Sequence, residues 1–144
     1  MGTWGTGPLD SDNALDMVDV IGFDPTRYRE VILARLLALT DMVIQQPRSA
    51  EELAEDMQGS LAACAVVADV RAGEYFYTRS PDPDEPEDFC LDYIERQEDL
   101  EAMARQALGM YRKMETERVD LGWRSAALYQ EHRQRLSELE KRLS

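Results

Sequence analysis

The sequence predicts an all-α fold, an irregular antiparallel helical bundle of five or six helices in one domain over residues 1–144. Three observations support this prediction. Apolar residues recur at steps of three and four over most of the chain, which is the spacing of one helix face. Strict alternation of apolar and polar residues is nowhere long enough to indicate a regular strand. Glycines and prolines that end helices separate the apolar stripes.

The composition is that of an acidic globular protein. The 144 residues are 44% hydrophobic and 31% charged, and the formal net charge is −13 at pH 7. Phosphate binding needs Lys and Arg, so this charge argues against nucleic acid or an anionic membrane as a direct partner. No run of about 18 apolar residues indicates a membrane span, and the N-terminus lacks the pattern of a secretory signal. With only Cys64 and Cys90, we expect a cytoplasmic protein without a disulfide framework.

The N-terminal segment, residues 1–12, is expected to pack on the helical core. Three glycines and Pro8 lie around Trp4, which excludes a helix or a regular strand there. Because the indole of Trp4 is large and apolar, we expect it to fill the core as a plug. An Asp or Ser at residues 10–12 then caps a helix over about residues 13–21, which Gly22 ends.

Two longer helices are expected in the first half of the chain. One runs over about residues 26–46 with an apolar stripe on one face, and Pro47 ends it. The other starts at a capping box and runs to about residue 71, again with one buried face. Gly59 predicts a bend or a break in its middle, and Gly73 is its natural C-cap.

Residues 74–88 are expected to form an acidic, proline-rich loop, with a minor two-stranded element near residues 75–78 as an alternative. Three more helices follow over about residues 89–97, 100–115 and 120–143. In the last of these, His132 lies on the apolar stripe, which favours a hydrogen-bonded packing residue over a catalytic base. Cys64 falls on a buried helix face and is expected to be an unreactive packing thiol.

The opening Met-Gly-Thr-Trp-Gly-Thr-Gly-Pro-Leu-Asp-Ser-Asp-Asn-Ala resembles a bacterial family, the domain of unknown function DUF4259. Its members typically open with Met-Gly-Ala/Thr-Trp-Gly-x-Gly-Pro-Phe-Asp-Asn-Asp-Asp-Ala. Residues 61–68 and the Leu/Arg-rich helix after Trp123 are also similar to segments of that family. The chain departs from the family pattern at Leu9, Met17 and Cys64, where phenylalanine, tryptophan and glutamate are usual. The resemblance implies a small soluble bacterial domain and carries no catalytic residue over.

Three early carboxylates are the candidate metal ligands. Asp12 and Asp16 lie one helical turn apart, and Asp10 lies on the adjoining loop. Carboxylate and backbone oxygens are the ligands that Mg²⁺ and Ca²⁺ prefer. The same residues also suit helix capping and the positive end of a helix dipole, and we favour this structural role because calcium loops have denser ligand spacing. We expect no cofactor and no enzymatic activity, since the sequence contains no assembled catalytic set.

The candidate binding surface combines the acidic loop with aromatic residues that flank it, Phe76 among them. In the simplest interpretation the charges are a solvated surface, and in the functional one they dock a basic protein around aromatic anchors. We favour a non-enzymatic protein-binding module, for example an inhibitor or immunity protein for a basic partner. The alternatives are a divalent-metal-binding domain or metal-dependent enzyme that uses the N-terminal aspartates, and a structural or oligomerisation domain. The predicted partner-binding residues are Tyr75, Tyr77, Asp82, Asp84, Glu85, Glu87, Asp88, Phe89 and Tyr93.

Overall fold

The computed structural model describes residues 12–40, 50–78, 94–117 and 126–144, and these residues form an all-α fold, as predicted. No β-strand occurs within these four ranges. None of the helices in the described part of the chain is both long enough and apolar enough to span a bilayer. The elements are α1 (Asp12–Phe23), the 3-10 helix η1 (Pro25–Arg27), α2 (Tyr28–Thr40), α3 (Ala50–Ala72), α4 (Glu98–Glu117) and α5 (Ala126–Leu143).

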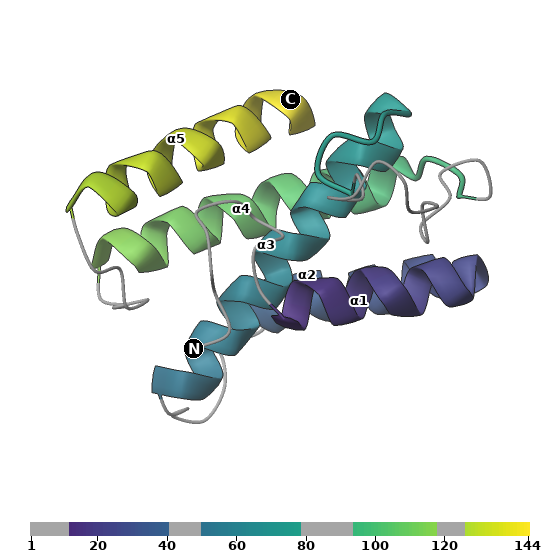
Figure 1. The fold of residues 1–144 in the computed structure, drawn as a ribbon, viewed down its shortest axis with the longest axis horizontal. Helices are drawn as coiled ribbons and strands as arrows, with labels where there is room; N and C mark the ends of the chain where they lie inside the picture. Colours follow the sequence, from purple (N-terminus) through teal and green to yellow (C-terminus); the bar gives the residue numbers. More distant parts are fainter. Residues whose placement is uncertain (1–11, 41–49, 79–93, 118–125) are drawn as a thin grey trace, which may run out of the picture.

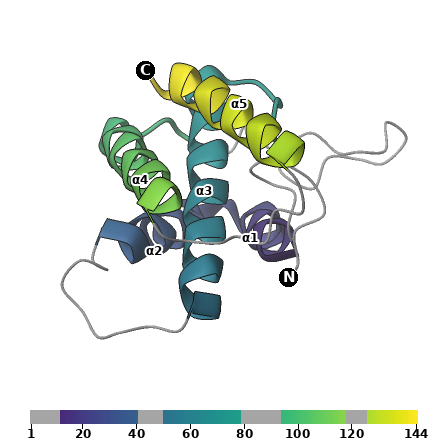
Figure 2. The ribbon, with the colours of Figure 1, turned by 90° about the vertical axis from the view of Figure 1, so that its left-hand side faces the viewer.

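Helix α3 runs through the middle of the molecule. In Figure 1, α4 and α5 lie above α1 and α2, and in Figure 2, α2 and α4 lie on one side of α3 while α1 and α5 lie on the other. Helix α3 contacts all four of the other α-helices, and α2 also packs against α4. The end of α3 near Ala72, the start of α4 and the end of α5 meet at one end of the bundle (Figure 1). This convergence positions the site described below.

The central place of α3 follows from its sequence. Every residue from Gly59 to Val70 is buried, so the prediction of a single buried face on this helix is wrong. A helix that is apolar all round is buried all round, and four of its residues here are alanines, which let neighbouring helices approach closely. The predicted break at Gly59 is also wrong, because α3 is continuous. Gly59 instead leaves room for Arg35, whose Nη1 lies 2.7 Å from where a Cβ would stand.

The helix ends are set by short-range chemistry. The Asp24 side chain caps η1 by accepting hydrogen bonds from the Thr26 backbone N–H at 3.2 Å and from its hydroxyl at 2.6 Å. Gly73 ends α3 as predicted, with φ +67°, a conformation that suits glycine. Gly22 does not end α1, which continues to Phe23.

Other predicted boundaries were wrong or fall outside the described residues. Residues 94–97 are not helical, so the predicted short helix does not reach Gln97, and residues 89–93 lie outside the description. Residues 75–78 do not form a strand. The Gly-rich N-terminal segment with Trp4 also lies outside the described residues, so its packing on the core stays a prediction.

Candidate functional site: an aromatic turn held by buried charges

The turn that follows α3, residues 74–78, carries the aromatic residues Tyr75, Phe76 and Tyr77, and we call it the aromatic turn. It begins where Gly73 reverses the chain. The backbone N–H groups of Gly73 and Glu74 both donate to the carbonyl of Asp69, at 2.8 and 3.2 Å. These bonds satisfy a carbonyl that the end of the helix would otherwise leave unpaired.

The carboxylate of Asp69 holds the far side of the aromatic turn. Its Oδ2 accepts hydrogen bonds from the backbone N–H of Tyr77 at 2.9 Å, and from the backbone N–H and the hydroxyl of Thr78 at 2.8 Å each. Asp69 is fully buried, and this burial raises the pKa of its carboxyl group, while the hydrogen bonds from Thr78 and Tyr77 act in the opposite direction. Its Oδ1 is buried and has no hydrogen-bond partner among the described residues. A buried acid thus fixes the path of a surface turn.

Phe76 is the exposed member of the aromatic turn. Its side chain is 45% exposed, whereas Tyr75 and Tyr77 are half-buried against the core. The Phe76 and Tyr77 rings meet edge to face, with centroids 4.8 Å apart and an interplanar angle of 87°. The guanidinium carbon of Arg142, on α5, lies 3.5 Å from the Phe76 ring centroid and 5.8 Å from that of Tyr77. Burial is also the main reason that the pKa of Tyr77 is raised to about 12.

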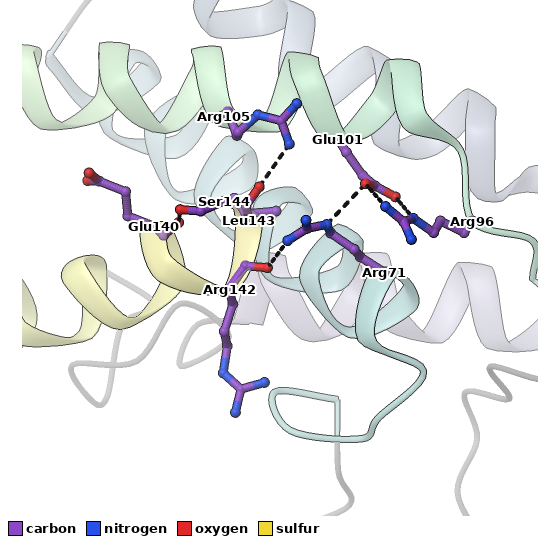
Figure 3. Close-up of polar contacts among 8 residues, drawn as sticks. All are labelled: Arg71, Arg96, Glu101, Arg105, Glu140, Arg142, Leu143 and Ser144. Atoms are coloured by element: carbon purple, nitrogen blue, oxygen red, sulfur yellow. Dashed lines mark hydrogen bonds and ion pairs between the residues drawn. The ribbon is translucent and has the colours of Figure 1, made fainter.

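A second buried acid, Glu101, lies at the same end of the bundle and forms what we call the Glu101 cluster with Arg71 and Arg96. Figure 3 shows the Glu101 carboxylate between the two guanidinium groups. Arg71 Nε donates to Oε1 at 3.1 Å, and Arg96 donates to Oε2 and Oε1 at 2.7 and 3.0 Å. The bonds to Glu101 raise the pKa of Arg96. Because Glu101 is only 3% exposed, these two cations compensate the cost of burying its charge.

The end of α5 is bound by two arginines from neighbouring helices. Arg71 Nη1 donates to the carbonyl oxygen of Arg142 at 2.7 Å, and Arg105 Nη1 donates to that of Leu143 at 2.8 Å (Figure 3). These carbonyls belong to the last turn of the helix, where no later backbone N–H can reach them. Arg71 therefore links the Glu101 cluster to the backbone of the residue whose side chain covers Phe76.

One family model matches the chain. It is described as domain of unknown function (DUF4259), and the match covers residues 2–135. The chain belongs to the DUF4259 family. This confirms the resemblance seen in the sequence. No curated protein and no solved structure matches the chain.

The structure of this DUF4259 chain describes two of the predicted partner-binding residues, Tyr75 and Tyr77, and brings them together in the aromatic turn. The other seven lie outside the described residues and stay predictions. Sequence analysis missed Asp69 and Arg142. Asp69 had a signal, since a lone acid in the apolar run from Cys64 to Val70 is a buried polar residue in need of partners. Arg142 had none.

The predicted metal ligands cannot be placed by the described part of the DUF4259 chain. Asp10 and the side chains of Asp12 and Asp16 lie outside it. Among the side chains that are described, no group of three or more His, Cys, Asp or Glu is arranged to hold a metal ion. Metal binding by the early aspartates, like a structural or oligomerisation role, therefore stays a prediction.

The DUF4259 core contains His132 and Cys64, the two residues that the sequence predicts to have packing roles. His132 is buried, as its place on the apolar stripe predicts, with its Nε2 2.9 Å from the Tyr111 hydroxyl. Cys64 is also buried, its Sγ lies 3.3 Å from the carbonyl oxygen of Ala104, and burial raises the pKa of the thiol to about 12. A buried neutral thiol is unreactive, which agrees with the predicted packing role.

Proposed function

We propose that this chain is a non-enzymatic protein-binding module that captures a basic protein partner, an inhibitor or immunity protein being one concrete form. The proposal depends on one observation. An exposed aromatic ring, Phe76, sits on a turn that the buried Asp69 holds in place, and this turn leads directly into the acidic stretch at residues 82–88. Binding residues are commonly found on surface loops that a rigid scaffold positions.

The energetics of the turn support this proposal. Burying a carboxylate costs free energy, and hydrogen bonds from neutral donors offset only part of that cost. A turn whose only task is to connect two helices does not require a buried acid. A fixed turn, by contrast, loses little conformational entropy when a partner binds, which favours affinity. Aromatic side chains are enriched among the residues that dominate binding energies.

The distribution of charge supports a basic partner. Residues 1–100 contain 22 Asp and Glu but seven Lys and Arg, whereas residues 101–144 contain seven Asp and Glu and nine Lys and Arg. The negative charge is thus concentrated in the part of the chain that includes the aromatic turn. Such a field attracts a cationic protein and raises its association rate, and salt weakens the effect.

A peptide-display selection against the immobilised chain tests the proposal. We expect the selected peptides to carry a net positive charge, and their binding to weaken as NaCl rises from about 50 to about 500 mM. Two variants locate the surface: Phe76→Ser, and the triple variant Asp82→Asn, Asp84→Asn, Glu85→Gln. Both should reduce binding of the selected peptides.

The matched control removes three negative charges elsewhere, with Asp19→Asn, Glu30→Gln and Glu55→Gln, all of which are exposed. This control has the same net charge as the loop variant but keeps the acidic residues of the loop. It should therefore bind the selected peptides more strongly than the loop variant does. Peptides without a charge bias, or equal losses in the two triple variants, would contradict the proposal.

A further inference from the structure

The contact between Arg142 and the aromatic turn differs from the other arginine contacts at this end of the bundle. Arg71 and Arg96 pair with the carboxylate of Glu101. The guanidinium of Arg142 contacts the rings of Phe76 and Tyr77, and no carboxylate of the described residues forms an ion pair with it. In Figure 3 its side chain points away from the Glu101 cluster, toward the turn that follows α3. The positive charge of Arg142 is therefore held by an aromatic surface.

The two sides of this contact differ in how firmly they are held. The aromatic turn is fixed by three hydrogen bonds to Asp69, two from backbone N–H groups and one from the Thr78 hydroxyl. The backbone of Arg142 is fixed by Arg71. The long side chain of Arg142 is the part that can move, and moving it leaves both backbones in place. The Phe76 ring is thus a prearranged surface with a replaceable cation on one face.

The face of an aromatic ring attracts a cation, and this attraction is a property of the Phe76 ring itself. The charged groups around the neighbouring Tyr77 are of both signs, with Glu138 and Asp69 on one side of the balance and Arg142 and Arg135 on the other. Glu74, at the start of the turn, is exposed. An arginine fits this place better than a lysine, because a planar guanidinium stacks on an aromatic face and is less strongly hydrated than an ammonium group.

We infer that Arg142 is an internal occupant of a guanidinium site on Phe76, and that an arginine of the basic protein partner displaces it from the ring on binding. This inference rests on the proposed function and specifies the contact that the partner makes. The intramolecular arginine lowers the apparent affinity, because the partner has to compete with it and also meets its positive charge. Removing the Arg142 side-chain charge should therefore strengthen the binding of an arginine-rich ligand.

The test measures the affinity of fluorescently labelled hexa-arginine for the full chain by anisotropy at low ionic strength. In Arg142→Met the apolar part of the side chain is kept and the guanidinium is lost. We expect this variant to bind the probe roughly two- to five-fold more tightly than the wild type, the range that one exposed cation–π contact supplies. The matched control is Lys141→Met, which makes the same change in charge at the adjacent, exposed position.

A second variant shows whether the gain depends on the ring. Arg142→Met combined with Phe76→Leu should bind hexa-arginine no more tightly than Phe76→Leu alone. The gain in Arg142→Met should also be smaller for hexa-lysine than for hexa-arginine. Circular dichroism and thermal unfolding establish that each variant is folded. These results together would support displacement of Arg142 from the ring by an incoming guanidinium.

The inference is overturned if Arg142→Met and Lys141→Met strengthen binding equally, since the effect would then be one of net charge. Weaker binding by Arg142→Met also overturns it, because Arg142 would then support the surface. Free arginine is also tested, at a concentration equal to that of the arginine side chains in the hexa-arginine probe. If it displaced the probe completely, the site would be assigned to a small molecule and the docking of a protein would be overturned. If the wild type binds basic probes and only the gain is absent, the proposed function survives; if no basic probe binds to any variant, both fail.

Discussion

Asp69 and Asp99 each hold two segments of the structure together, but they do so in opposite environments. Asp69 is buried, accepts hydrogen bonds from neutral donors in the aromatic turn, and has its pKa raised by burial. Asp99 is exposed and joins α4 to α2 by an ion pair with Arg29, with Nη2 and Oδ2 2.6 Å apart. The hydrogen bond from Arg29 is the main reason that the pKa of Asp99 is lowered. The hydrogen-bond distances of Asp69 and Asp99 are similar, but one carboxyl group is buried among neutral donors and the other is paired with an arginine in water.

The comparison shows where this fold depends on polar contacts. At the end of the bundle where α3, α4 and α5 meet, loss of a partner leaves a buried charge or a buried N–H group without compensation. Between α2 and α4, water replaces a lost partner, and the packing of the two helices does not depend on the pair. The substitutions below test this difference.

The largest effect is expected from Glu101→Gln. The substitution removes the buried carboxylate and leaves the charges of Arg71 and Arg96 without their partner. Because both arginines reach solvent, water compensates part of this loss. We therefore expect the free energy of unfolding to fall by about 3 kcal/mol, the lower end of the range for a broken buried ion pair. Urea denaturation measures it. The control Glu138→Gln makes the same change at an exposed site on α5 and should stay within about 0.5 kcal/mol of the wild type. Equal losses in the two variants would show that burial does not decide the effect.

Asp69→Ala should rank second. The change removes the acceptor for the backbone N–H groups of Tyr77 and Thr78, and we expect a loss of about 2 kcal/mol, measured in the same way. Asp69→Asn keeps a side-chain oxygen that can accept the same bonds, so its loss should be clearly smaller. If the two variants lost the same stability, the hydrogen bonds to the turn would not be the source of the effect.

Gly73→Ala tests the start of the aromatic turn and should cost about 1 kcal/mol, because φ +67° is unfavourable for a residue with a Cβ. Nothing lies within 4 Å of the position that this Cβ would take, so a steric clash does not contribute. Gly109 on α4 is equally open, and there Ala should raise stability by up to about 1 kcal/mol through helix propensity. The two Gly→Ala variants should therefore differ in sign in thermal unfolding, and the same sign for both would contradict this account of the turn.

The smallest effect at neutral pH is expected from Asp99→Asn, and pH sharpens its contrast with Asp69. The pKa of Asp69 is raised in the folded state. Its contribution to stability is therefore fully present below 3.8, the ordinary pKa of an aspartate, and is lost as pH rises through the folded-state pKa. The pKa of Asp99 is lowered in the folded state. Its contribution to stability is therefore present above 3.8 and is lost as pH falls through the folded-state pKa.

Urea titrations between about pH 3 and pH 7 measure both contributions as differences from the wild type. The stability of the wild type relative to Asp69→Asn should fall as pH rises. Its stability relative to Asp99→Asn should rise as pH rises. Parallel pH dependences for the two variants would contradict the comparison between a buried and an exposed aspartate.

Local patterns in the sequence were sufficient for the helical class, for the C-cap at Gly73, and for the burial of His132 and Cys64. Each of these depends on the geometry of one helix, because the 3.6-residue period alone decides which side chains share a face. The same reasoning failed for α3, where it predicted one buried face. A period identifies the apolar face of a helix but does not say how many neighbours surround it.

Only the tertiary structure decided which charges meet. Arg71 lies 30 residues from Glu101 and 71 residues from the Arg142 carbonyl that it binds. The chain has 16 Lys and Arg and 29 Asp and Glu, so many pairings are possible, and no local spacing selects among them. Packing of α4 and α5 against the end of α3 makes that selection. The same packing puts Arg142 on the Phe76 ring, which is why the sequence pointed to the aromatic residues and gave no sign of their cation.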